Sequence, residues 1–130
     1  MNAKLVLVAM TFIALVVVNS CGEKEESNSY EVAYVTAVDA PTSVKVNEPV
    51  NINVSFEVRN GCGMFEKFEE TKDGQLITLE VKASYKDGMC TQAIKTITAD
   101  YTFTPREKGD YQIRFKSSPT AFKTVDLPVD

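Results

Sequence analysis

Residues 50–59 read VNINVSFEVR, and this stretch decides the fold of the chain. From Val50 to Val58 every second residue is apolar, and the residues between them are polar. Successive side chains of a β-strand point to opposite faces of a sheet, so strict alternation predicts a strand with one face in a core and one in water. A helix would repeat its apolar residues every three or four positions instead. We therefore expect residues 50–59 to form a half-buried β-strand.

The same period of two recurs on both sides of this stretch. It predicts strands at 77–85, 97–103, 111–115 and 125–129, with less regular β-rich segments at 30–38 and 43–46. Turn signals separate the runs, and the Asp-Gly pairs at 73–74 and 87–88 are expected to form hairpin turns. Pro128 predicts that the last strand lies at a sheet edge, because proline cannot donate to a ladder. The best helical candidate is the short segment 64–70.

Six or seven strands, roughly ten residues apart and each with one apolar face, predict an all-β fold, an antiparallel β-sandwich of about seven strands. Within it, residues 103–115 resemble the corner between two strands of immunoglobulin-like domains. Gly109 stands in the turn, and the hydroxyl of Tyr111 would bond back across it. Ile113 occupies the place of an antibody core cysteine, and the chain has no tryptophan. The resemblance is therefore to the broad immunoglobulin-like class, over residues 30–130.

The composition argues against several classes of function. The chain has 130 residues, enough for one domain, and 44% are hydrophobic and 25% charged. A formal net charge of −4 argues against a nucleic-acid partner, because phosphate binding requires a basic surface. The chain has no histidine, which removes Ser-His and Cys-His nucleophile pairs and histidine metal sites. We expect no catalysis, no cofactor and no metal.

The beginning of the chain reads as an export signal. Lys4 is followed by 14 uncharged residues, 5–18, which suit the apolar region of a signal peptide and are short for a membrane span. The junction VNSC at 18–21 resembles a bacterial lipoprotein lipobox, in which the chain is cut before a cysteine that then receives lipid. Asn19 departs from that pattern, because it is larger and more polar than the usual residue. Ordinary cleavage after Ser20 and a transmembrane anchor are the alternatives.

The lipobox resemblance implies that Cys21 carries acyl chains, which give a durable membrane anchor. It divides the chain into a signal peptide (1–20), a lipidated cysteine with a flexible polar tether (21–29) and the sandwich domain. The acidic start of the tether resembles the surface-export signal of Bacteroidota lipoproteins. The whole chain is similar to a group of small lipoproteins of the Bacteroidota that share the NGCGxF segment at 60–65. We expect the cell envelope as location, at the outer membrane, on its periplasmic or surface leaflet.

With Cys21 lipidated, two cysteines remain, and an even pair in an exported protein predicts a disulfide between Cys62 and Cys90. The bridge would close a loop of 29 residues, 62 through 90, which stabilises a domain by about 3–4 kcal/mol through chain entropy. A redox or catalytic pair is the alternative. The cysteines lack the CxxC spacing, and no histidine is present to activate a thiolate.

The segment 60–73 is the candidate binding site. We expect a loop there, pre-organised by the disulfide, which displays large apolar and acidic side chains: Met64, Phe65, Phe68, Glu69 and Glu70. The alternative is that the aromatic residues cap the open end of the core. The acids of this segment also suggest calcium, but they lack the DxDxDG spacing, and Lys67 and Lys72 lie among them. A solvated charged loop explains them more simply.

Together these features favour a membrane-anchored exported lipoprotein that acts as a non-catalytic binding or structural module in the cell envelope. It would contact the membrane through Cys21 and bind another protein or an envelope polymer. The alternative is a proteinase inhibitor of the chagasin type, because the turn at 60–63 follows a strand as the cleft-filling loop of those inhibitors does. Their NPTTG motif is absent. A third interpretation, an enzyme, lacks a nucleophile motif.

Overall fold

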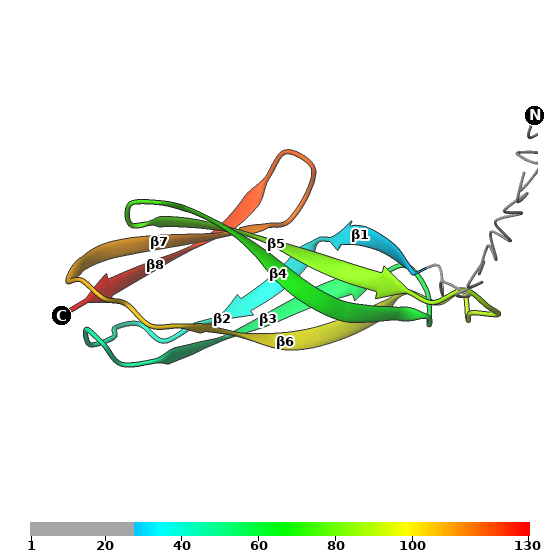
Figure 1. Cartoon of the computed structure of the whole chain (residues 1–130), viewed down its shortest axis with the longest axis horizontal. Coiled ribbons are helices and arrows are strands. Elements are labelled where there is room, and N and C mark those ends of the chain that lie inside the picture. Colours follow the sequence, from blue (N-terminus) through cyan, green and yellow to red (C-terminus); the bar gives the residue numbers. More distant parts are fainter. Residues whose placement is uncertain (1–27) are drawn as a thin grey trace, which may run out of the picture.

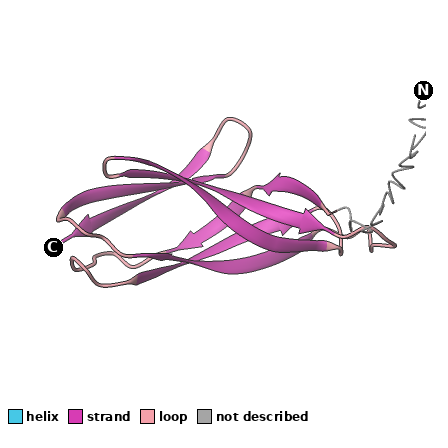
Figure 2. Cartoon of the chain, in the orientation of Figure 1, coloured by secondary structure: helices cyan, strands magenta, loops and turns pink. Residues whose placement is uncertain are grey.

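The computed structural model describes residues 28–130, which form eight β-strands and, within that range, no helix (Figure 2). The predicted signal peptide, Cys21 and most of the predicted tether lie outside the described residues. The strands are β1 (Ser29–Ala33), β2 (Val35–Asp39), β3 (Val50–Val58), β4 (Gly63–Asp73), β5 (Leu76–Tyr85), β6 (Lys95–Phe103), β7 (Gly109–Lys116) and β8 (Phe122–Val129).

The strands form two facing sheets, as Figure 1 shows. The smaller sheet has the order β2-β3-β6 and is antiparallel throughout. The larger sheet is built around β5. Strand β4 pairs along the whole length of β5, while β1 pairs with residues 81–85 and β7 with residues 76–79. Because β4 occupies one edge of β5, strands β1 and β7 share the other, and β8 completes the sheet beside β7.

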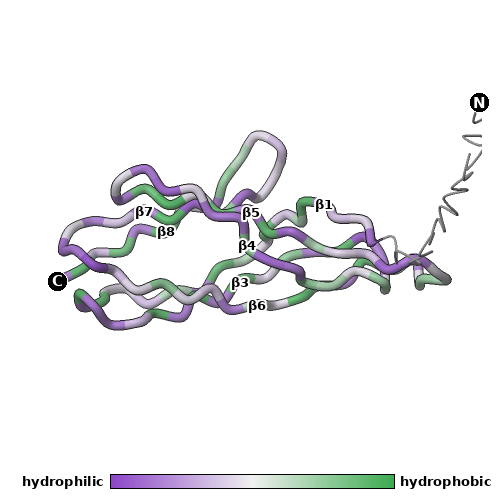
Figure 3. The backbone as a smooth tube through the Cα atoms, in the orientation of Figure 1, coloured by the Kyte–Doolittle hydropathy of each residue, from purple (hydrophilic) through white to green (hydrophobic). Residues whose placement is uncertain are grey.

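The predicted all-β sandwich is confirmed, and so are the predicted strands in β3, β5, β6, β7 and β8. The alternating residues of β3 point in turn into the core and into water, and Figure 3 shows this alternation of hydropathy along the strands. The inner faces of both sheets supply the core, whose largest fully buried side chains are Phe56 and Phe115. Pro128 lies in β8, which is an edge strand as predicted.

Three details of the predicted topology were wrong. The segment 30–38 is two strands, because the chain leaves the larger sheet after Ala33 and joins the smaller sheet at Val35. The total is eight strands, close to the expected number of about seven. The sandwich is not wholly antiparallel: β6 crosses to the other sheet between β5 and β7, so β7 returns parallel to β5. The segment 43–46 makes one isolated bridge, between Val44 and Val129, instead of a strand.

The segment 63–73 is strand β4, and the predictions of a loop and of a short helix at 64–70 were wrong. The two-residue turn after Asp73 joins β4 to β5 in a hairpin, with Gly74 in the left-handed region at a φ of 58°. A β-bulge between Phe65 and Lys67 inserts one extra residue. Phe65 and Phe68 therefore face inward although they are three positions apart, which is the spacing of a helix. The other Asp-Gly pair, 87–88, lies in the connection between the sheets and not in a hairpin.

The corner before β7 depends on a glycine. Gly109 has a φ of 134°, and a Cβ there would lie 2.5 Å from the side chain of Gln75. The amide of Gln75 donates a hydrogen bond to the carbonyl of Lys108 at 3.1 Å. Tyr111 is buried, and its ring packs edge-on against Phe103 with ring centroids 5.2 Å apart. Tyr111 thus contacts this corner through its ring, and the predicted hydrogen bond of its hydroxyl across the turn is not confirmed.

The predicted disulfide between Cys62 and Cys90 is confirmed, with the two Cα atoms 5.4 Å apart. It joins the turn after β3 to the connection after β5. A backbone hydrogen bond of 2.9 Å from Gly61 to the carbonyl of Thr91 supports the same junction. The bridge therefore fixes both segments at one end of the sandwich.

The sandwich has two distinct ends, set by the two ends of β5. Ser29 and Gly63 both pair with Tyr85, so the start of the described chain and the disulfide share what we call the N-terminal end. The turn after β4, residues 104–108 and the C-terminus gather around Leu76, at the C-terminal end (Figure 1). A strand of ten residues is about 30 Å long, so the ends lie about that far apart.

We predict that the disulfide is a major source of stability. Changing Cys90 to Ser should lower the free energy of unfolding by about 3 kcal/mol, because the unfolded chain then loses its 29-residue loop constraint. Urea unfolding of both proteins would measure this. Alkylation of the denatured protein without reductant is the control: modification at both Cys62 and Cys90 would show that the pair is not bonded.

Candidate functional site

The five side chains predicted to form a binding loop are divided between two faces of β4. The β4–β5 register places Phe65 opposite Ala83 and Phe68 opposite Val81, both core positions. Met64 belongs to the outer face, where 49% of its surface is exposed. The sequence could not show this division, because it depends on the bulge. The predicted set therefore does not form one continuous binding surface.

Phe65 and Phe68 belong to a row of rings that closes the side of the sandwich. Both are half-buried and pack against the core. The row runs from one sheet to the other through Phe56, Phe65, Phe68, Tyr101 and Phe115, with centroid separations of 5.9, 4.9, 5.5 and 6.4 Å. The two pairs that involve Tyr101 are edge-to-face and the other two are tilted, and edge-to-face ring pairs at such distances are favourable. The alternative interpretation, that these aromatic residues cap the core, fits this packing.

The two predicted acids are paired. The hydroxyl of Tyr101 donates a hydrogen bond of 2.9 Å to Glu70 Oε2, and Lys72 Nζ lies 3.0 Å from Glu70 Oε1. Burial, and then this hydrogen bond, raise the pKa of the Tyr101 hydroxyl above its ordinary value. Glu69 lies within 3.7 Å of Lys67 and within 3.6 Å of Lys82. The contacts with Tyr101 and Lys82 join β4 to β6 and β5, and each of the two acidic side chains lies beside a lysine.

No group of three or more acidic or cysteine side chains in residues 28–130 is placed to hold a metal ion. No helix in the same range is long and apolar enough to cross a membrane.

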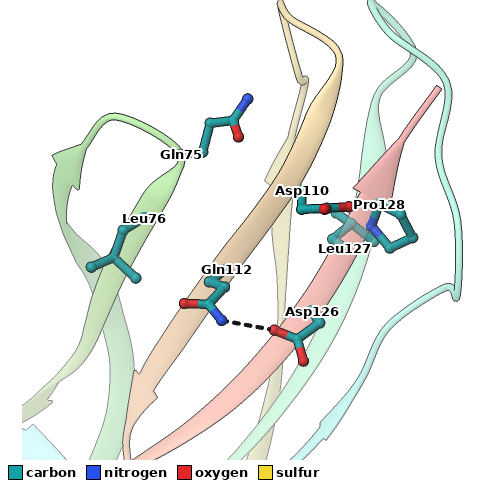
Figure 4. A pocket seen from close by; sticks show the side chains of 7 residues that line it. All are labelled: Gln75, Leu76, Asp110, Gln112, Asp126, Leu127 and Pro128. Atoms are coloured by element: carbon teal, nitrogen blue, oxygen red, sulfur yellow. Dashed lines mark hydrogen bonds between the residues drawn. The ribbon is translucent and has the colours of Figure 1, made fainter.

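An open hollow at the C-terminal end, which we call the polar depression, was missed by sequence reasoning (Figure 4). Its lining residues are Gln75, Leu76, Asp110, Gln112, Asp126, Leu127 and Pro128, and its volume is about 640 Å³. They come from three strands and one turn, which the parallel pairing of β5 with β7 brings together. No local pattern signals that arrangement.

The chemistry of the polar depression is that of hydrogen bonding. Asp110 and Gln112 are exposed on β7, and their partners on β8 are Pro128 and Asp126. Gln112 Nε2 donates a hydrogen bond of 3.2 Å to Asp126 Oδ1. Two carboxylates and two side-chain amides thus line an open groove beside the apolar side chain of Leu76. Such a surface can bind a polar chain lying across it.

A second hollow lies where β1 of the larger sheet meets β2 and β3 of the smaller sheet. Arg59 pairs with Glu31 through two nitrogens, at 3.0 to 3.2 Å, and its guanidinium lies 4.3 Å from the ring centroid of Tyr85. The hydrogen bond to Glu31 raises the pKa of Arg59 above its ordinary value. Tyr34 and Ile94 line the same hollow with exposed apolar surface. Charged and apolar side chains thus share the lining of this hollow.

We predict different outcomes for neighbouring residues of β4. Phe65→Ser or Phe68→Ser should each lower the free energy of unfolding by about 2–4 kcal/mol, because each ring is packed against the core. The matched control Met64→Ser should change it by less than about 0.5 kcal/mol, since Met64 is on the exposed face. Thermal and urea unfolding would measure all three. Equal stability of the Phe68→Ser protein and the parent would contradict the role of the aromatic row.

The comparisons with known proteins identify a family and no individual relative. The family model of the ORF11 beta-sandwich domain matches residues 52–125, which is more than half of the chain and includes both cysteines of the disulfide. Among curated proteins and among solved structures there is no match. The matched range runs from β3 into β8, in agreement with the two-sheet architecture. The chain belongs to the ORF11 beta-sandwich domain family.

Proposed function

We propose that the protein is an exported lipoprotein, held in the membrane through Cys21, which acts as a non-catalytic binding or structural module in the cell envelope. The observation that carries the proposal is the placement of the polar depression at the end of the sandwich opposite to the beginning of β1. A module anchored at one end can present its other end to a partner. The lipobox resemblance at 18–21 supplies the anchor.

The dimensions of the chain suit this arrangement. Six residues, 22–27, lie between Cys21 and Asn28, the first described residue, and the seven Cα–Cα steps from Cys21 to Asn28 span at most about 25 Å when fully extended. The N-terminal end would therefore stay close to the membrane. The length of β5 adds about 30 Å, so the polar depression would reach roughly 30–55 Å from the membrane surface.

The nature of the polar depression favours binding over chemistry. It is open, and its carboxylates and amides suit hydrogen bonds to an extended partner, either a segment of another protein or an envelope polymer. The sheet holds these groups on strands, which reduces the entropy lost on binding. The proteinase-inhibitor alternative would use the turn at 60–63, which is at the N-terminal end and would face the membrane. We therefore do not propose it.

Anchoring is tested by changing Cys21 to Ala. The variant should take up no palmitate analogue and should move from the membrane fraction to the soluble fraction, because the acyl chains supply the anchor. Metabolic labelling and fractionation measure both effects. The Cys90→Ser protein is the matched control, since it should keep its label. Continued labelling of the Cys21→Ala protein would contradict the proposal.

Partner binding is tested by placing a photo-crosslinking amino acid at Gln112, in the polar depression. In intact cells it should give specific crosslinks to a protein or a polymer. The matched control is the same amino acid at Thr96, an exposed position on the outer face of the smaller sheet near the N-terminal end. Crosslinks from both positions alike, or from Thr96 alone, would show that the C-terminal end is not the binding surface.

A further inference from the structure

The exposed large apolar side chains of the domain are concentrated at one end. Within residues 28–130 they are Tyr30, Tyr34, Met64, Met89, Ile94 and Phe122. Four of them belong to the N-terminal end, and we call these four, Tyr30, Met64, Met89 and Ile94, the apolar tip. Single exposed apolar residues are ordinary, and what distinguishes these four is that they occur at the same end of the domain.

The strand register brings two of the four side by side. Tyr30 on β1 and Met64 on β4 both pair with Ser84 of β5, one from each side. Ser84 is buried between them, with 9% of its surface exposed, although it belongs to the outer face. The tyrosine and the methionine thus flank Ser84, the last residue but one of β5.

The other two come from the connection between β5 and β6. Met89 is fully exposed, and Ile94 has 68% of its surface exposed immediately before the start of β6. In Figure 1 this connection extends past the ends of the strands. The disulfide at Cys90 holds it to the turn after β3, so it is fixed in this extended position. The covalent constraint therefore keeps an apolar side chain in water at the extreme end of the domain.

We propose that the apolar tip docks on a lipid bilayer, the same membrane in which Cys21 is anchored. This inference rests on the proposed lipidation of Cys21. Because at most about 25 Å of chain separates Cys21 from the domain, the end that carries the tip is the part nearest to the bilayer. The chain length outside the structure, and the end of the sandwich that it joins, thus select lipid as the occupant.

The side chains of the tip match the membrane interface in chemistry. Tyrosine places an apolar ring among acyl chains and its hydroxyl among headgroups. Methionine and isoleucine gain about 25 cal/mol for each Å² that they remove from water. Lys95 follows Ile94 and Lys86 lies three residues before Met89; both lysines are exposed, and their long side chains can reach lipid phosphates. The lipid anchor makes this contact intramolecular, so even a weak affinity suffices.

The test uses the absence of tryptophan from the chain, which makes any introduced tryptophan a unique probe. Met89→Trp is placed in the full lipidated protein, reconstituted in phosphatidylethanolamine–phosphatidylglycerol vesicles with and without brominated acyl chains. Its emission should shift to shorter wavelength and lose intensity when the lipid is brominated. The matched control is Glu107→Trp, exposed at the C-terminal end, which should show neither effect.

The outcomes distinguish a failure of docking from a failure of the lipid anchor. An unshifted and unquenched Met89→Trp signal, in protein that carries its acyl label, overturns docking and leaves the anchor intact. A blue shift without quenching by brominated lipid also overturns docking, because it shows that a second copy or another protein covers the tip. Quenching at position 89 in protein without acyl label supports docking and overturns the anchor. Because Met89 is fully exposed, its replacement should leave the unfolding temperature unchanged.

Discussion

The hydrogen-bond ladders along β5 determine the shape of the larger sheet and the positions of both candidate surfaces. This strand pairs with β4 along one edge and with β1 and β7 along the other. Backbone groups in a buried strand must find partners, so a central strand paired on both edges tolerates little displacement. Its first residue, Leu76, lines the polar depression. Its last residue, Tyr85, pairs with the first residue of β1 and with the first residue of β4. The two ends of the domain are therefore the two ends of one strand.

The sequence predicted the strands that have one buried face and one exposed face. It failed for the strand in which most residues are exposed and a bulge shifts the alternation. In β3 and β5 one face is completely buried, so period two is visible in the sequence. In β4, an edge strand, most residues are exposed and a bulge shifts the alternation, which made Phe65 and Phe68 look helical. The polar depression depends on the parallel pairing of Leu76 with Gln112, a contact between distant strands that no local pattern reports. The disulfide was predictable because the pairing of two remaining cysteines follows from their number and does not depend on how the strands are arranged.

The disulfide has a second consequence besides stability. A long connection between two sheets would normally fold its apolar residues against the core or fluctuate. Here Cys90 and the hydrogen bond to Thr91 hold the connection against the turn after β3. Met89 is then displayed in a fixed position. The same bond that offsets the small size of the core thus determines which side chains the N-terminal end presents.

A solid sandwich has little interior in which to place a function, so its ends and outer faces must supply it. In this domain the two ends differ in chemistry: one carries Tyr30, Met89 and Ile94, and the other carries Asp110 and Gln112. A domain tethered by a flexible segment alone would sample all orientations, and its binding surface would face the membrane part of the time. Contact of the apolar end with lipid would remove that freedom and hold the polar end outward. A difference of this kind between the ends would give the proposed anchored module a defined orientation, which a presented binding surface requires.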